Sequence, residues 1–143
     1  MNDRSQRPNG EERPPITLSE SDADAIAGLA VGIEERMPEL AGLLQDEVDR
    51  ADIVPAGSVP PHIVQMGSFV EFADDSTGRT RTVQLVFPAE ADIAAGKISI
   101  LTPIGAGLIG LHEGHSIIWP DRDGDSHVLR VVKVSSTAPA QNG

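Results

Sequence analysis

The chain has 143 residues, a formal net charge of −11 and no cysteine. This length suits one domain or a small domain with an appendage, and the lack of cysteine excludes disulfides and thiolate metal sites. No basic face is visible in the sequence, so we expect no direct sequence-specific binding of duplex DNA.

No apolar run is long enough to span a bilayer, and residues 1–15 (MNDRSQRPNGEERPP) lack the apolar segment of a secretory signal peptide. We therefore expect a cytoplasmic protein without a membrane anchor. The same fifteen residues are rich in proline, glycine and charge, which predicts a disordered tail. Residues 137–143 are expected to form a second, flexible tail.

Residues 16–56 have the pattern of two amphipathic helices joined by a short turn. Ser19 is a suitable N-cap, with Asp22 three positions later as in a capping box. Gly32 is expected to end the first helix in the left-handed conformation, and Pro38 to open the second. Apolar residues recur at helical spacing on both segments: Ile26, Leu29, Ile33, Leu40, Leu43, Leu44, Val48 and Ala51. The pattern predicts an antiparallel helical hairpin, a short coiled coil.

This predicted hairpin carries most of the excess negative charge, with ten acids against Arg36 and Arg50, a net charge of −8. Its tip carries Glu34, Glu35 and Arg36. Such a segment favours a basic protein partner that is steered by charge. A solvated helix surface explains the same charges equally well.

Residues 57–136 have the alternation of a β-rich domain. Strands are predicted at residues 63–72, 79–87, 98–101, 116–119 and 127–134, with one short helix at residues 104–111. In the second strand Val83, Leu85 and Phe87 are expected to face the core. The predicted fold class is α+β, with a twisted antiparallel sheet that wraps the short helix.

The start of the short helix, from Gly105 through Gly107 to Gly110, fits the G-x-G-x-x-G fingerprint of dinucleotide-binding proteins. A true fingerprint needs a longer helix and an acid about 20 residues further on, whereas that position is Arg130. The small residues are better explained by close packing of the helix on the sheet. A dinucleotide-binding regulator is kept only as a minor alternative.

Two further clusters suggest metal sites, and we expect neither to bind a metal. The Asp121–Asp125 segment resembles a calcium loop, but its glycine is at the fourth position and its twelfth position is Val132. A β-hairpin turn explains it better. His112 and His115 are three residues apart and do not form H-E-x-x-H, so we expect a turn with two exposed histidines. No cofactor is expected.

Residues 96–119 resemble the signature of the C-terminal domain of the Gre transcript-cleavage factors, a family of transcription elongation factors. Together with residues 46–51, 60–68 and 85–92, they resemble more closely the Rnk branch of that family, "regulator of nucleoside diphosphate kinase". The resemblance implies an FKBP-like domain that binds RNA polymerase near its secondary channel. The resemblance also implies a regulator without enzyme activity. The nucleoside diphosphate kinase in the family's name would be the product of a gene that the protein regulates, not an activity of the protein itself. A monomer is favoured.

Carried over by position, the resemblance implies a polymerase-binding surface. Its residues are Asp92, Ser99, Thr102, Pro103, Gly105 and Leu108. Thr102 stands where the family more often has serine, and His115 where it has an acid. The alternative is that Thr102 and Pro103 only end a strand and that Asp92 only turns a loop.

The resemblance also bears on transcript cleavage. Gre factors reach the polymerase active centre with a long coiled coil whose tip carboxylates help to hold a catalytic metal ion. Here each predicted helix has about 13–15 residues and projects only roughly 20 Å, at about 1.5 Å per residue. Glu34 and Glu35 are therefore expected to stop short of the metal. We expect a competitor of Gre factors that does not stimulate cleavage.

The alternative function is an FKBP-like peptidyl-prolyl isomerase or chaperone module. Such enzymes have pockets walled by aromatic side chains, and the candidates here are Phe69, Phe72, Phe87 and Trp119. The alternation of the strands assigns Phe72 and Phe87 to the core rather than to a pocket.

Overall fold

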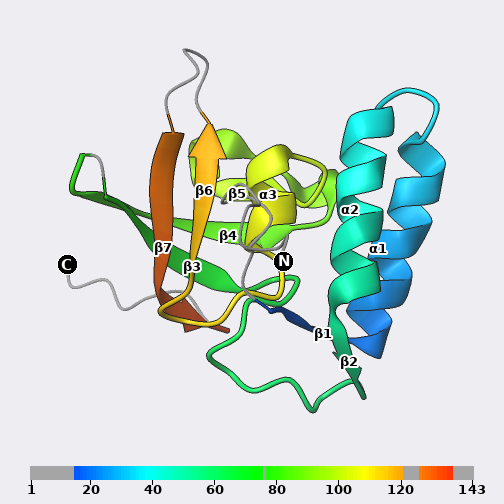
Figure 1. The fold of residues 1–143 in the computed structure, drawn as a ribbon, viewed down its shortest axis with the longest axis horizontal. Coiled ribbons are helices and arrows are strands. Elements are labelled where there is room, and N and C mark those ends of the chain that lie inside the picture. The colour runs from blue at the N-terminus through cyan, green and yellow to red at the C-terminus, as the bar shows by residue number, and fades with distance from the viewer. Residues whose placement is uncertain (1–14, 76, 121–125, 137–143) are drawn as a thin grey trace, which may run out of the picture.

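The computed structural model describes residues 15–75, 77–120 and 126–136 of the chain (Figure 1). The predicted tail at residues 137–143, the first fourteen residues and the Asp121–Asp125 segment lie outside these ranges. Helices and a curled sheet are both present, so the predicted α+β class is confirmed.

Two helices, α1 (Glu20–Ile33) and α2 (Pro38–Arg50), lie side by side and are joined by a turn at residues 34–37; we call this unit the helix pair (Figure 1). The predicted starts are confirmed, because Ser19 Oγ accepts from the N–H of Asp22 at 3.0 Å and Pro38 opens α2. The left-handed C-cap at Gly32 is wrong, since Gly32 lies within α1 and has no positive φ. The N–H groups of Arg36 and Met37 close the helix end instead, both donating to the carbonyl of Ile33.

The Asp22 side chain connects α1 to the segment that leads into β3. Its Oδ2 accepts from the backbone N–H of Met66 at 3.1 Å, across 44 positions of sequence. Burial raises the pKa of the Asp22 carboxyl above its usual range, and the hydrogen bond from Met66 offsets part of this rise.

A two-stranded parallel sheet closes the base of the helix pair. It consists of β1 (Thr17–Ser19) and β2 (Asp52–Val54), with Leu18 opposite Ile53. Neither strand was predicted from the sequence. Three-residue strands carry too few residues for a period, and their pairing depends on the helices between them bringing the two ends together.

The main sheet has five strands in the order β5-β4-β3-β7-β6. Their bounds are β3 (Phe69–Asp74), β4 (Arg79–Val86), β5 (Lys97–Ser99), β6 (Ser116–Pro120) and β7 (Ser126–Ser135). The expectation of a wholly antiparallel sheet is wrong, because β5 pairs with β4 in parallel. The connection between them makes two 3-10 turns, η3 (Pro88–Glu90) and η4 (Ile93–Ala95), which bring the chain back before β5 begins.

The predicted strand at residues 63–72 starts only at Phe69. Before it, Ile63 makes an isolated bridge with His112, and Val64 exchanges backbone hydrogen bonds with Leu111 and Gly110. A turn with a positive φ at Gly67 then leads into β3. The apolar alternation reflects burial of this segment against the chain after the short helix, not a longer strand.

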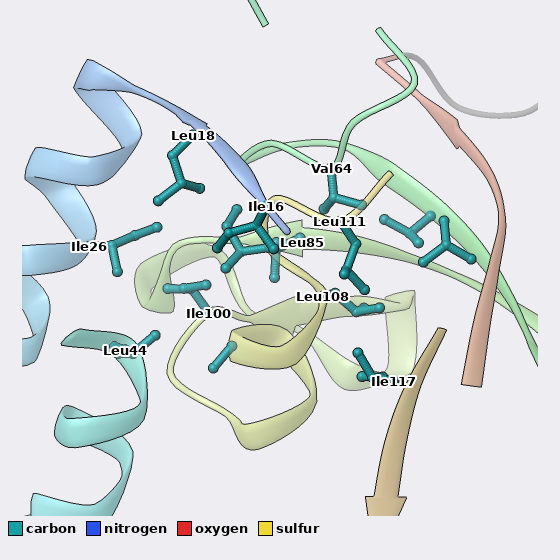
Figure 2. Packing of buried hydrophobic residues seen from close by; sticks show 14 of the residues in the cluster. Ile16, Leu18, Ile26, Leu44, Val64, Leu85, Ile100, Leu108, Leu111 and Ile117 are labelled. Carbon is teal, nitrogen blue, oxygen red and sulfur yellow. The ribbon is translucent and has the colours of Figure 1, made fainter. Parts of the chain in front are cut away.

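One hydrophobic core runs through the helix pair and the sheet (Figure 2). Ile16 and Leu18 lie in it between Ile26 and Leu44 of the helix pair and the side chains from the sheet and the short helix. The expected core residues Val83 and Leu85 are buried, and Phe87 is half-buried against the core. The division into a hairpin at residues 16–56 and a β domain at residues 57–136 stays a prediction.

The short helix is α3 (Pro103–Leu108), which ends three residues earlier than predicted because Gly110 adopts a φ of +81°. A Cβ at Gly110 would lie 2.8 Å from Cβ of Ile16, and one at Gly105 would collide with the carbonyl oxygen of Ser99. Close packing of the helix on a strand end therefore accounts for Gly105, as the sequence analysis predicted.

Gly105→Ala and Gly110→Ala are each expected to lower the free energy of unfolding by about 1–3 kcal/mol, since backbone must move in both cases and Gly110 also has a left-handed conformation. Urea denaturation measures the change. Gly28→Ala is the control, because nothing lies within 4 Å of its added Cβ and α1 should gain about 0.5–1 kcal/mol. Equal effects at Gly28 and Gly105 would contradict the packing described.

Asp22→Asn and Asp22→Ala are expected to differ in stability. Asn can still accept from Met66, whereas Ala leaves that N–H without its partner and should cost about 1–3 kcal/mol. Because the folded-state pKa is raised, the contribution of Asp22 is full below its ordinary pKa of 3.8 and is lost as the pH rises through the raised value.

The stability of Asp22→Asn relative to the unchanged protein should therefore increase between pH 4 and pH 7. Urea denaturation at both pH values tests this, with the exposed Asp24→Asn on the same helix as the control for a lost charge. A difference that falls with rising pH would show that the hydrogen bond outweighs burial.

Candidate partner-binding surface

The start of α3 is built by two hydroxyl groups. Ser99 Oγ accepts from the N–H of Leu101 at 2.9 Å. Thr102 Oγ1 donates to the carbonyl of Ser99 at 2.7 Å and accepts from the N–H of Gly105 at 3.1 Å, which makes Thr102 the N-cap. Pro103 follows at the first helical position and is exposed. These bonds fix the backbone that presents Pro103.

Of the six residues that the resemblance points to, three are buried. Ser99, Gly105 and Leu108 lie within the fold, and Leu108 is only 1% exposed. Their side chains support the surface rather than form it. Thr102 is half-buried, and of the six only Pro103 and Asp92 are exposed.

Asp92 lies on the connection between β4 and β5. It exchanges two 2.9 Å backbone hydrogen bonds with Lys97, and its Oδ1 accepts from the N–H of Ala95 at 3.3 Å as the N-cap of η4. The next side chain, Ile93, is 82% exposed. Ile93 was not among the predicted site residues, although an isoleucine among alanines and charges in a loop is a visible signal.

A groove connects the tip of the helix pair to the start of α3. It has a volume of about 580 Å³ and is lined by Arg36, Met37, Pro38, Glu39, Leu40, Leu43 and Pro103. The groove therefore brings together a residue expected at the tip and one expected in the partner surface. Leu43 was missed as a site residue because helical spacing assigns it to a face without saying what lies opposite, and Met37 was missed because it was assigned to the turn.

The tip residues Glu34, Glu35 and Arg36 are exposed. Not every acid of the helix pair is at the surface, because Glu47 is 2% exposed and accepts from Arg50 Nη2 at 3.0 Å. No group of three or more His, Cys, Asp or Glu side chains among the described residues is placed to hold a metal ion.

His112 and His115 are not exposed, contrary to expectation; both are partly buried. Their rings stack with centroids 4.9 Å apart, and His62 meets His112 edge to face at 5.5 Å. Burial lowers the pKa of His112, and its two histidine neighbours lower it further. The cluster lies where the segment before β3 meets the loop after α3, so the three rings act as packing groups there.

Of the aromatic residues of the isomerase alternative, Phe72 is the one that lines a hollow on the sheet. Phe72 is 5% exposed, and Phe69 and Phe87 are not among the described residues that line this hollow. The side chain of Trp119 lies outside the described part of the chain. In the part of the chain that the structure describes, no helix is both long and apolar enough to cross a membrane.

Comparisons with known proteins agree with this arrangement. Residues 59–136, more than half of the chain, match the family "Transcription elongation factor, GreA/GreB, C-term". Residues 14–54 match the family "Rnk N-terminus". The chain belongs to the GreA/GreB family of transcription elongation factors. Its N-terminal match marks the Rnk branch of that family.

Individual relatives cover most of the chain. "Regulator of nucleoside diphosphate kinase" of Escherichia coli K12 is 34% identical over 127 residues, 85% of this chain and 90% of that protein. "Transcription elongation factor GreA" of Azorhizobium caulinodans is 34% identical over 74% of this chain and 73% of its own length. The solved structure of a prokaryotic transcription elongation factor GreA/GreB from Nitrosomonas europaea has a TM-score of 0.71 and 33% identity. It covers 84% of this chain and 98% of that one.

Thr102→Val is expected to destabilise the start of α3 by about 1 kcal/mol, since it removes the N-cap acceptor, while Thr102→Ser should change stability little. Hydrogen exchange of the Gly105 amide measures the effect locally. Its protection should fall in Thr102→Val and persist in Thr102→Ser. Unchanged protection in both variants would contradict the capping role.

Proposed function

We propose that this protein binds RNA polymerase near its secondary channel, competes there with Gre cleavage factors and does not stimulate transcript cleavage. Membership of the elongation factor family supports a role in transcription. The finer proposal depends on the length of the helix pair and on the surface around Pro103.

The length of the helix pair is the observation that carries the absence of cleavage. With 14 residues in α1 and 13 in α2, it extends roughly 20 Å at about 1.5 Å per residue. The long coiled coil of Gre factors reaches much further. Glu34 and Glu35 offer the carboxylates that Mg²⁺ prefers, but at this length they stop inside the channel. Arg36 beside them also offsets part of their charge.

Docking is proposed through the sheet side of the molecule, as an FKBP-like module. Three exposed side chains support this: Asp92 and Ile93 on one loop and Pro103 at the start of α3. The groove beside Pro103 offers an apolar floor of Met37, Leu40 and Leu43 for a partner side chain. Exposed acids of the helix pair would steer a basic partner surface toward it.

A cleavage assay tests the function. Stalled elongation complexes incubated with the protein should keep their RNA 3′ ends, and Gre factor added afterwards should cleave more slowly than without it. Prompt cleavage that is lost in a Glu34→Ala/Glu35→Ala double variant would instead make this protein a cleavage factor. Unchanged Gre cleavage at saturating protein would overturn the competition.

A binding assay tests the surface. Asp92→Ala/Pro103→Ala should weaken polymerase binding by roughly 5- to 30-fold, the effect of losing about 1–2 kcal/mol at an interface centre. Val132→Ala, which changes an exposed apolar residue on β7, is the control and should bind as before. Circular dichroism verifies that both variants fold. Equal affinity of the two variants would show that docking uses another face.

A further inference from the structure

A second hollow, which the proposed function does not use, lies on the sheet near the end of the β3–β4 hairpin. Its volume is about 620 Å³, and its lining includes Phe72, Ile104 and Leu129 together with Arg79 and Arg81. In Figure 1 this end of the hairpin extends beyond α3, on the side of the molecule away from the acidic helix pair.

The pairing of the strands explains why two arginines line an apolar hollow. Side chains alternate along a strand, so Arg79 and Arg81 share the face of β4 that carries the buried Val83 and Leu85. Across the pair, Arg81 is opposite the buried Phe72. The core-facing row of β4 thus changes from apolar to cationic toward the hairpin end.

The two arginines differ from two other arginines of the described part of the protein in making no ion pair there. Arg130 Nη1 lies 3.0 Å from Asp75 and Arg50 Nη2 lies 3.0 Å from Glu47. Neither Arg79 nor Arg81 has an ion pair or side-chain hydrogen bond among the described residues. Asp74 also lines the hollow, so its described lining holds two cations against one anion.

We propose that this hollow binds a small organic anion with a flat apolar body. Arginine forks bind phosphate, sulfonate or carboxylate groups in bidentate geometry. Arg79 and Arg81 are two positions apart, about 6.6 Å along a strand, so both side chains can reach one anionic group. The apolar body then covers Phe72, Ile104 and Leu129. The volume lies within the roughly 300–1,000 Å³ of small-molecule sites.

An alternative explanation is protection of a sheet edge. β5 pairs with Gln84–Val86 of β4, so among the described residues Arg79–Val83 has a partner strand on one side only. Charged residues on such an edge discourage pairing with other chains. Edge protection predicts aggregation when the arginines are removed, and it predicts no saturable ligand binding. The two explanations therefore differ in what they predict for a ligand titration.

The test uses two fluorescent probes with nearly the same aromatic body. 8-Anilinonaphthalene-1-sulfonate carries an anion, and N-phenyl-1-naphthylamine does not. The full chain should bind the sulfonate probe saturably. Arg79→Gln/Arg81→Gln should weaken that binding by about tenfold or more, because it removes charge-assisted hydrogen bonds. Binding of the neutral probe should change less than about twofold, and inorganic pyrophosphate should displace the sulfonate probe only.

Lys97→Gln/Lys133→Gln removes two exposed charges outside the hollow and is the matched control. Equal weakening of the sulfonate probe by both double variants would overturn the proposal, because only net charge would then matter. If Arg79→Gln/Arg81→Gln aggregates, the test is instead a titration of the unsubstituted protein with the sulfonate probe, followed by the NMR chemical shifts of its backbone amides. Probe-induced shifts confined to residues 72–75, 77–81, 104 and 129 support the site, and shifts elsewhere or none overturn it.

Discussion

The passage of residues 16–19 between the helix pair and the sheet is the constraint on which the rest of the structure depends. Ile16 and Leu18 are almost fully buried between the two units, so neither unit has a complete core without them. Thr17 donates to the carbonyl of Gly110, and Asp52 donates to that of Ile16. Three segments that are distant in sequence meet along this short strand. Only glycine at position 110 lets them approach so closely.

The candidate partner surface depends on that meeting point. Gly110 ends the turn after α3, and Gly105 seats the start of the same helix against the end of β5. Both ends of α3 are thereby fixed by backbone contacts rather than by exposed side chains. Pro103 is consequently held at a defined place beside the helix pair. The shape of the groove between them therefore depends on the packing of the core beneath α3.

Much of the fold could be predicted from the sequence because its signals are local. Ser19 and Pro38 opened the two helices as expected, and the alternation at Val83 and Leu85 identified a strand with its buried face. What could not be predicted depends on contacts between distant segments. The parallel pairs β1–β2 and β4–β5 are only three residues long, and nothing in their own composition selects a partner.

The candidate site shows the same limit. Resemblance pointed to the turn at Ser99–Pro103 as part of a partner surface, which stays a prediction, and it could not say that Leu108 is buried or that Ile93 is exposed. Asp22 was expected to take part in a capping box at the start of its own helix, and its side chain instead accepts a hydrogen bond from the N–H of Met66. A polar residue near a helix start has several possible partners, and the tertiary arrangement decides among them.

The closed base of the helix pair has a consequence for how such proteins can diversify. β1 precedes α1 and β2 follows α2, so their pairing holds the base of the helix pair together. Residues inserted symmetrically at the turn would therefore lengthen the helix pair without disturbing its packing on the sheet. Seven residues added to each helix would move the tip outward by about 10 Å and would nearly preserve which side chains face the partner helix. The length of the helix pair is thus a modular variable, and descent with paired insertions can change reach while the rest of the fold stays the same.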